Sequence, residues 1–301
     1  MSEHLSDKAY ELLGAPLADR IEYVNHDKWI GYPRANEVLS LMEDLMNYPK
    51  VERMPSLLIV GNTNNGKTQI LKRFCTRYPV DISEDDYNVI QPLVFISAPP
   101  KPDENEFIIR LLQELLVPYS KTDSVGTKRA QVMRTMEARE TKMLIIDEVQ
   151  HIIAGSYNAQ RTFLNSIKDL SNKLKIPIVA AGIEDAFHAI QVDAQLANRF
   201  QVEVLEPWRF DTREQKRAFA SLIASIEQRL PLPEPSFLYK PPFIEHLHYL
   251  SEGLIGELVT LLKKLSIDAM RNDLPKITTG RLEALNFLPP SKRKELLKRM
   301  R

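Results

Sequence analysis

Between residues 56 and 207, short apolar runs alternate with segments whose apolar side chains recur at helical spacing. The runs occupy residues 57–60, 93–98, 142–146, 176–181 and 202–205, and each has the length of a buried strand. Helices are expected between them, at 107–116, from about 129 to 139, and around the apolar positions Phe163, Leu164, Ile167 and Leu170. Strands that alternate with helices predict βαβ units and a mainly parallel sheet buried on both faces.

The regions on either side of this alternation lack strand-like runs. Residues 1–50 are amphipathic at helical spacing, with breaks at Pro16, Pro33 and Pro49. After Pro207 we expect only helices, at 213–229, 243–250 and 255–270, and then a tail rich in Lys and Arg. The predicted domains are an N-terminal helical segment (1–50), an α/β core (51–207), a small helical lid-type domain (208–275) and a basic tail (276–301).

The first run of the core leads into a glycine loop. Residues 61–68 read GNTNNGKT, a full match to G-x-x-x-x-G-K-[ST], and an apolar-periodic helix follows. Backbone N–H groups of such a loop cradle the β-phosphate of a nucleotide, while Lys67 would bridge the β- and γ-phosphates and the Thr68 hydroxyl would hold Mg²⁺. An accidental match in a glycine-containing turn is the alternative, and the flanking strand and helix argue against it.

A second motif lies at the end of the run at 142–146, where Asp147 and Glu148 follow directly. Asp147 is placed to hold Mg²⁺ through water opposite Thr68, and Glu148 to polarise the attacking water. Acids at a strand end are weak evidence alone and strong evidence after a complete phosphate loop. The two motifs predict an ATPase that uses ATP and Mg²⁺, with the candidate nucleotide-binding residues Gly61, Asn62, Thr63, Asn64, Asn65, Gly66, Lys67, Thr68, Gln69 and Asp147.

Composition narrows the setting. The chain has 301 residues, a length typical of about two domains, with 44% hydrophobic and 27% charged residues and a formal net charge of zero. A neutral chain has no global basic field, so any contact with nucleic acid must come from local patches. The single cysteine, Cys75, rules out an intrachain disulfide and suits a reducing compartment. With no bilayer-length apolar run and no signal-like N-terminus, we expect a cytoplasmic protein without a membrane partner.

Longer stretches of the sequence resemble TniB, a transposition ATPase related to the AAA+ protein TnsC. They are IIDEVQH, GSYNAQRTFLNSIKDLSNKL, IPIVAAGIEDA and QLANRF, with SEGLIGELVTLLKK and ITTGRLE nearer the C-terminus. The resemblance covers residues 20–285 and implies an AAA+ P-loop fold with a helical lid. It further implies a homo-oligomeric ring or filament on double-stranded target DNA, an integrase-type transposase as partner, and a target-selector protein as a further one.

The same resemblance assigns one more catalytic candidate. It also shows two positions at which this sequence lacks a polar residue that is usual in AAA+ proteins. Arg199 matches the arginine-finger position, from which it would reach the γ-phosphate held by a neighbouring subunit; the alternative is a helix-end arginine in a surface ion pair. The polar residue expected after the 176–181 strand is missing, so its role is either vacant or falls to Glu184. The arginine expected near residues 253–257 is also absent. Both departures predict slow hydrolysis.

Candidate DNA contacts follow from related ATPases, which line a DNA-facing channel from the region between the second strand and the Asp-Glu pair. The candidates here are Lys101, Lys121, Lys128 and Arg129, although scattered cations are more often solvated surface. The tail from Lys292 to Arg301 could dock on DNA or on the transposase, or simply be solvated. The segment 29–34 could line an adenine pocket or fix the N-terminus to the next helix.

These features bear on three candidate functions. The first is an AAA+ regulator that binds target DNA and activates a transposase. The second is an AAA+ loader or switch of the replication-initiator type, acting on DNA outside transposition. The third, a nucleotide-binding scaffold without hydrolysis, is disfavoured because Lys67, Thr68, Asp147 and Glu148 are all present.

Overall fold

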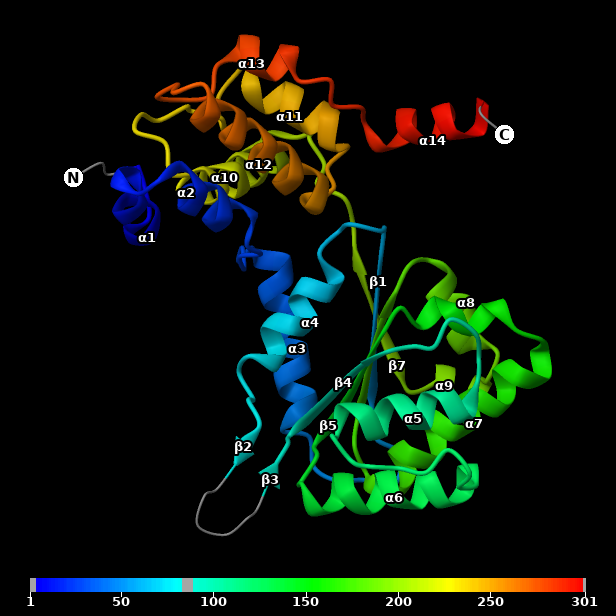
Figure 1. Ribbon diagram of the computed structural model, residues 1–301. Coiled ribbons are helices and arrows are strands. Elements are labelled where there is room, and N and C mark those ends of the chain that lie inside the picture. Colours follow the sequence, from blue (N-terminus) through cyan, green and yellow to red (C-terminus); the bar gives the residue numbers. More distant parts are fainter. Residues whose placement is uncertain (1–3, 83–88, 300–301) are drawn as a thin grey trace. The chain divides into compact units, whose positions relative to one another are not determined.

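The computed structural model describes residues 4–82 and 89–299 (Figure 1). Its contacts divide the chain into two compact units: a core unit, Pro33–Leu205, and a helical unit formed by Met1–Tyr32 together with Glu206–Arg301. The N-terminal segment of the sequence prediction is therefore shared between the two. Its part up to Tyr32 belongs with the C-terminal helices, and the helix that follows belongs to the core.

The core unit is built on a five-stranded parallel sheet in the order β4-β5-β6-β1-β7. Its strands are β1 (Ser56–Gly61), β4 (Leu93–Ser97), β5 (Met143–Asp147), β6 (Ile178–Gly182) and β7 (Phe200–Leu205). Every residue of β1, β5 and β6 is buried. Burial on both faces explains why these strands are apolar runs without alternation.

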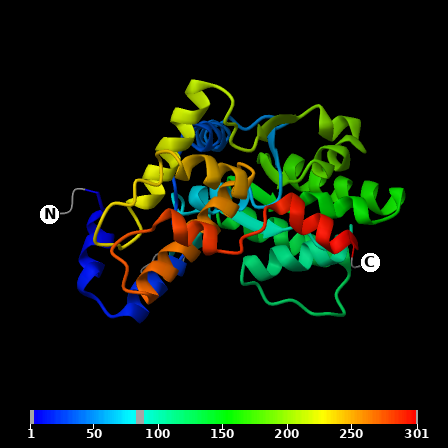
Figure 2. The ribbon, with the colours of Figure 1, turned by 90° about the horizontal axis from the view of Figure 1, so that it is seen from above.

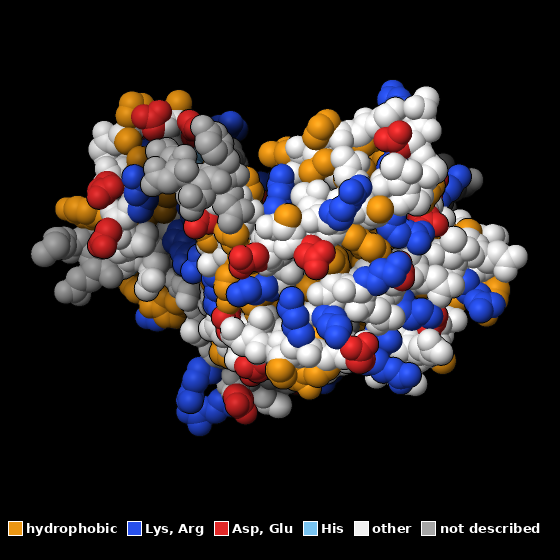
Figure 3. Space-filling view, turned by 90° about the horizontal axis from the view of Figure 1, so that it is seen from below, with side chains coloured by type: hydrophobic (Ala, Val, Ile, Leu, Met, Phe, Trp, Pro, Cys, Tyr) orange, Lys and Arg blue, Asp and Glu red, His pale blue; other side chains and the backbone are white. Residues whose placement is uncertain are grey.

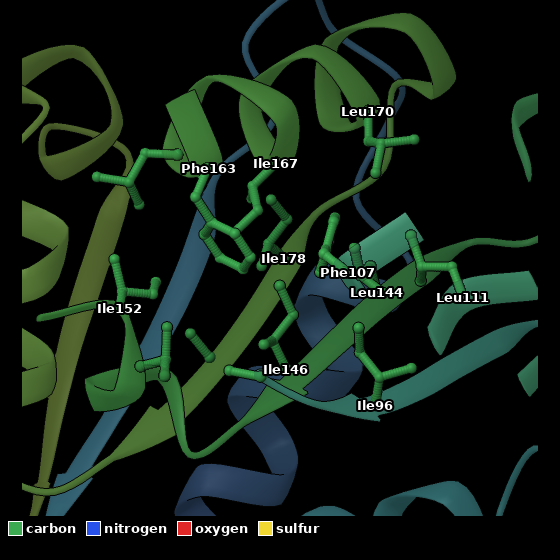
Figure 4. Close-up of a cluster of buried hydrophobic side chains, with 14 of the residues drawn as sticks. Ile96, Phe107, Leu111, Leu144, Ile146, Ile152, Phe163, Ile167, Leu170 and Ile178 are labelled. Carbon is green, nitrogen blue, oxygen red and sulfur yellow. The ribbon is translucent and has the colours of Figure 1, made fainter. Parts of the chain in front are cut away.

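One face of the sheet is covered by α5 (Glu104–Glu114), α6 (Val125–Ala138) and α7 (Tyr157–Leu174). Figure 4 shows Phe163 and Ile167 of α7 directed toward the apolar side chains of β5 and β6. The rings of Phe107 and Phe163 meet edge to face, with centroids 5.0 Å apart, which favours close aromatic packing. The opposite face carries α4 (Lys67–Cys75), which packs on β1 and β6, and α3 (Pro33–Met46) packs against α4.

The parallel arrangement brings the C-terminal ends of the strands to one edge of the sheet. There β1 ends at the glycine loop, β5 ends at Asp147, and β6 ends at Gly182. A short 3₁₀ helix, η2 (Val149–Ala154), follows β5, and the helices α8 (Asp185–Gln191) and α9 (Ala194–Ala197) lie between β6 and β7. Ligands of open α/β sheets bind outside this edge.

The sequence prediction lacked one small feature of the core. An antiparallel pair, β2 (Asp81–Ile82) with β3 (Val89–Ile90), precedes β4 and has two residues in each strand. Strands of two residues are too short for a periodic signal in the sequence.

The helical unit contains only helices among its described residues. They are α1 (Asp7–Glu11), η1 (Leu12–Gly14), α2 (Leu17–Asn25), α10 (Arg213–Glu227), α11 (Phe243–Ser251), α12 (Ile255–Arg271), α13 (Thr279–Ala284) and α14 (Pro290–Arg299). Figures 1 and 2 show the blue N-terminal helices beside α12, and α2 packs on α12. α14 buries no residue. Within the described part of the chain, no helix combines the length and apolarity needed to span a membrane.

Candidate nucleotide-binding site

The glycine loop joins β1 to α4 at the C-terminal edge of the sheet. Gly66, the residue before α4, has a left-handed backbone with φ 86°, and Asn64 is left-handed as well, with φ 63°. These two residues turn the chain sharply, and glycine and asparagine are the residues that adopt this conformation at least cost. Asn62 and Thr63 complete the loop, and Gln69 lies in the first turn of α4. The loop and a helix N-terminus are thus placed as a phosphate site requires.

Lys67 is the first residue of α4, and its side chain folds back over the loop. Its Nζ donates to the carbonyl oxygens of Gly61, at 2.7 Å, and Asn62, at 2.8 Å, and the residue is only 6% exposed. Burial lowers the pKa of Lys67, and the carboxylates of Glu148 and Asp147 oppose that shift. A desolvated cation beside two acids and a helix N-terminus is suited to bind a phosphate group.

Thr68 and Asp147 form the second contact of the site. The Thr68 hydroxyl donates to Oδ2 of Asp147 at 2.6 Å, which links the start of α4 to the end of β5. Oδ1 of Asp147 accepts from the backbone N–H of Glu148 at 2.9 Å, so the carboxylate is held on both oxygens. A hydroxyl and a carboxylate in contact are the oxygen donors that Mg²⁺ takes in P-loop proteins. These residues therefore fit the expected magnesium ion.

The loop is also fixed to β7, a link that the sequence analysis did not foresee. Asn65 is 3% exposed and donates from Nδ2 to the carbonyl oxygen of Leu205 at 2.7 Å. A Cβ at Gly61 would lie 2.8 Å from the same oxygen, so only glycine allows β7 to approach this closely. The first glycine of the motif thus serves sheet packing as well as the turn.

Glu148 follows β5 in a left-handed conformation with φ 57° and ψ 36° and precedes η2. Its side chain accepts a hydrogen bond from Nε2 of Gln150. Oε1 of Gln150 in turn accepts from the backbone N–H of Ile183, at 3.3 Å, just after β6. No motif pointed to Gln150, because the residues it joins lie far apart in the sequence. Glu184, the alternative considered for the polar role after this strand, is exposed.

Arg199 lies at the opposite edge of the sheet. Its carbonyl oxygen accepts from the N–H of Ser56 at the start of β1, and its Nη1 donates to Oδ1 of Asn172 on α7 at 2.7 Å. Burial and the nearby Arg53 lower the pKa of Arg199. At about 3.3 Å per residue, β1 separates Arg199 from the phosphate loop of its own chain by roughly 17 Å.

The four DNA-contact candidates fall into two pairs. Lys101 and Lys121 are exposed. Lys128 is 2% exposed and donates to Oδ1 of Asn105 at 3.2 Å, while Arg129 is ion-paired with Glu104. In the view of Figure 3, Lys and Arg side chains are interspersed with Asp and Glu rather than gathered in one patch. Of the four candidates, Lys128 and Arg129 have side-chain partners, whereas no side-chain hydrogen bond or ion pair is described for Lys101 and Lys121.

Comparison with known proteins identifies the family. A protein-family model described as "Bacterial TniB protein" matches residues 20–210. The chain belongs to the TniB family. This confirms the resemblance found in the sequence; no curated protein matches the chain.

Three solved structures illustrate the fold that this TniB family member shares. The Aeropyrum pernix ORC1 protein, in complex with DNA, matches with a TM-score of 0.61 at 14% identity over 88% of this chain and 68% of that chain. Pyrobaculum aerophilum Cdc6p matches with a TM-score of 0.58 at 16% identity, over 85% and 68%. Domain III of the Thermotoga maritima replication initiation protein DnaA matches with a TM-score of 0.55 at 17% identity, over 90% and 97%. At such identities these matches establish the fold, and the predicted P-loop AAA+ fold is confirmed.

Proposed function

We propose that this TniB family member is an ATP-dependent regulator of DNA transposition that binds and hydrolyses ATP. One observation carries the proposal: the family match spans the segment in which the phosphate loop, Thr68 and Asp147 come together. A complete loop alone would support any P-loop protein, and the family adds the connection to transposition. The fold likeness to the ORC1, Cdc6 and DnaA structures supports an AAA+ machine acting on DNA.

Each residue of the site has a role in this proposal. Lys67 would leave the loop carbonyls and bind the β- and γ-phosphates, and backbone N–H groups from Gly61 to Thr68 would bind the β-phosphate. Thr68 and Asp147 would hold Mg²⁺, which when bound neutralises charge that develops on the phosphate oxygens. Glu148 would accept a proton from the attacking water. ATP and Mg²⁺ are the cofactors that this arrangement supports.

We also propose that the active form is a homo-oligomer, a ring or filament, in which Arg199 acts on a neighbour. The support is its position at the N-terminal edge of the sheet, remote from the phosphate loop of the same chain. An arginine there could stabilise phosphate charge only on another subunit. Asn172, its present partner, would release the guanidinium when a neighbour docks.

Mixing two variants tests this role. Arg199→Ala keeps the phosphate loop, and Lys67→Ala keeps the arginine, so a mixed oligomer contains interfaces with both residues intact. We expect ATPase activity in the mixture that neither variant shows alone. If mixed oligomers form and remain inactive, Arg199 is a structural arginine that orders α7 through Asn172.

Double-stranded DNA is the proposed polymer partner, bound without regard to sequence. Lys101 and Lys121 are exposed and available for phosphate contacts, and Lys128 and Arg129 would first have to leave Asn105 and Glu104. Contacts of this kind weaken steeply with salt. An integrase-type transposase and a target-selector protein are the proposed protein partners. The helical unit would act as a lid, and α14 would dock on DNA or on the transposase. The proposed location is the cytoplasm.

Electron microscopy of the full chain with duplex DNA is the direct test. With a non-hydrolysable ATP analogue we expect ordered assemblies on DNA, and with Lys67→Ala none. Glu148→Gln keeps the size of the side chain and removes the base, so it should bind ATP, hydrolyse it slowly and form longer-lived assemblies. Stimulation of an integrase-type transposase by these assemblies would separate transposition from the alternative, a replication-initiator-type loader. Assembly on DNA that does not depend on ATP would contradict both the transposition regulator and the loader.

A further inference from the structure

The turn after β5 is held at three points by side chains that no nucleotide-binding motif includes. Gln150 links it to Glu148 and to Ile183, and His151 approaches the carbonyl oxygen of Ala98 at 3.5 Å. At the far end, Gln160 donates to the carbonyl oxygens of Ile153, at 3.1 Å, and Gly155, at 2.8 Å. Of these contacts, only the one from Gln150 reaches the candidate catalytic base.

The two ends of the Gln150 amide have different and unambiguous partners. The carboxylate of Glu148 can only accept, so it must face the amide nitrogen; the N–H of Ile183 can only donate, so it must face the amide oxygen. The orientation of the amide is therefore set by its surroundings. A single side chain thus joins the base that follows β5 to the backbone that follows β6.

The end of β6 is shaped to admit this side chain. A Cβ placed on Gly182 would lie 2.4 Å from Oε1 of Gln150, a distance at which one of the two groups must move. β6 ends in Ala181 and Gly182, which have no polar side chain to offer to the site. The polar group at this strand end therefore comes from Gln150, across the gap that the glycine leaves.

Glu148 is held through its side chain and through its backbone. Its carboxylate accepts from Gln150, and with that of Asp147 it opposes the burial-lowered pKa of Lys67. The left-handed backbone at Glu148 adds to this fixation, because a non-glycine residue adopts it at a cost and only where its neighbours hold it.

We propose that Gln150 is a positioning residue for ATP hydrolysis, which orients the carboxylate of Glu148 and couples it to the end of β6. This inference rests on the ATPase function proposed above and adds a residue that acts through Glu148 without touching ATP. Gln150 takes the place of the polar residue that β6 itself lacks. A shift of the backbone at Ile183 would then move the base, so β6 could control hydrolysis without changing the phosphate loop.

The test compares three variants of the full chain, assayed with Mg²⁺–ATP and duplex DNA. Gln150→Ala removes the tether and should lower kcat by about tenfold to a hundredfold, while ATP affinity stays within about threefold of wild type. Gln150→Glu has nearly the same shape but sets a carboxylate against Glu148. A carboxylate cannot donate to Glu148, so kcat should fall as in Gln150→Ala although the shape of the side chain is kept. A side chain that only filled space would tolerate this change.

Gln160→Ala is the matched control, because it loosens the same 3₁₀ turn and leaves Glu148 untouched. We expect wild-type kcat and wild-type affinity for ATP. Gly182→Ala should also lower kcat, because its added Cβ would lie 2.4 Å from Oε1 of Gln150; the same Cβ would lie 2.6 Å from the Cβ of Ala186, so this variant disturbs α8 as well and is a less specific probe than Gln150→Ala.

Two results would overturn the assignment of Gln150: a wild-type kcat in Gln150→Ala, or losses in kcat and ATP affinity that Gln160→Ala reproduces. If the protein is not an ATPase at all, the result is different: the wild-type protein would neither bind ATP in a Lys67-dependent manner nor hydrolyse it. In that case the positioning role would be overturned together with the ATPase itself.

Discussion

Glu227 in the helical unit and Lys67 in the core unit are both buried charges, but their partners differ in kind. Glu227, the last residue of α10, is 8% exposed and accepts hydrogen bonds from three backbone N–H groups of the loop that follows, those of Ser236, Phe237 and Leu238, at 2.7–2.9 Å. Lys67 donates to two carbonyl oxygens of a glycine loop at the open edge of the sheet. In the proposed function Lys67 exchanges those carbonyl oxygens for the phosphates of ATP.

The hydrogen-bond partners of a buried charge indicate whether it serves the fold or a ligand. The carboxylate of Glu227 accepts from three N–H groups of one loop, so it closes that loop, and three of its roughly four acceptor positions are already used. Lys67 donates to carbonyl oxygens of the glycine loop, Thr68 donates to Asp147, and all three residues lie where helix and strand ends meet. A buried charge of the first kind should matter for stability, and one of the second kind for ligand affinity.

The largest effect is expected from Glu227→Ala. Removal of the carboxylate leaves three N–H groups without an acceptor, so the free energy of unfolding should fall by about 4 kcal/mol. Urea denaturation monitored by circular dichroism measures this. Glu234→Ala in the same loop is the control, because Glu234 forms only an exposed pair with Lys276 and its removal should cost at most about 0.5 kcal/mol. Equal losses in the two variants would contradict the structural role of Glu227.

Lys67→Ala should change the affinity for ATP much more than the stability of the fold, the reverse of Glu227→Ala. ATP affinity should fall by about a hundredfold, or roughly 3 kcal/mol, because the variant lacks the cation that meets the phosphates. The free energy of unfolding should change by less than about 1 kcal/mol, since the desolvated ammonium contributes little to the folded state. Titration with a fluorescent ATP analogue, alongside the same urea curves, checks both values. A variant that binds ATP within a few fold of wild type would remove Lys67 from the site.

Asn65→Ala should give a smaller effect on both quantities. It breaks the hydrogen bond to Leu205 and lets the loop move relative to β7, so we expect a loss of about 1 kcal/mol in stability and a several-fold weaker affinity for ATP. Asn62→Ala, in the same loop, is the comparison in binding assays. If Asn65→Ala changes neither quantity, β7 does not support the loop.

The smallest effect is a pH dependence with opposite signs in the two units. Burial, with Lys263 and Arg229 nearby, lowers the pKa of Lys28 in the helical unit to about 8, and burial raises the pKa of Cys75 in the core to about 11. An unfolded lysine titrates near 10.4 and an unfolded cysteine near 8.5. Between pH 8 and about 10.4 the unfolded chain binds more protons at Lys28 than the folded chain does, so this group makes the free energy of unfolding rise with pH. Between about pH 8.5 and pH 11 the folded chain binds more protons at Cys75 than the unfolded chain does, so this group makes the free energy of unfolding fall with pH.

Differences between wild type and variants isolate the two contributions. From pH 8 to 10, wild type should gain up to about 1 kcal/mol relative to Lys28→Gln, after allowance for solvent screening of a partly exposed group. Over the same range wild type should lose stability relative to Cys75→Ala. Urea midpoints at pH 7, 8, 9 and 10 measure both differences. Parallel curves for wild type and Lys28→Gln would show that Lys28 keeps an ordinary pKa.

Much of the site could be predicted from the sequence because its parts are local. The loop from Gly61 to Thr68 carries its own turn residues, and Asp147 and Glu148 follow an apolar run that can only be a buried strand. Three of the five strands, β1, β5 and β6, were predicted for the same reason, since burial on both faces leaves continuous apolar runs. The family could be predicted too, because its motifs extend over most of the chain.

Only the tertiary structure decided which distant residues meet. It places Gln150 between Glu148 and Ile183, attaches Asn65 to Leu205, and buries Lys128 against Asn105. It also assigns the first 32 residues to the helical unit. Polar side chains carry no periodic signal for the partner they will find, because hydrogen bonds depend on where folded elements end in space. The sequence determines what each element is, and the packing of those elements determines which of their ends come into contact.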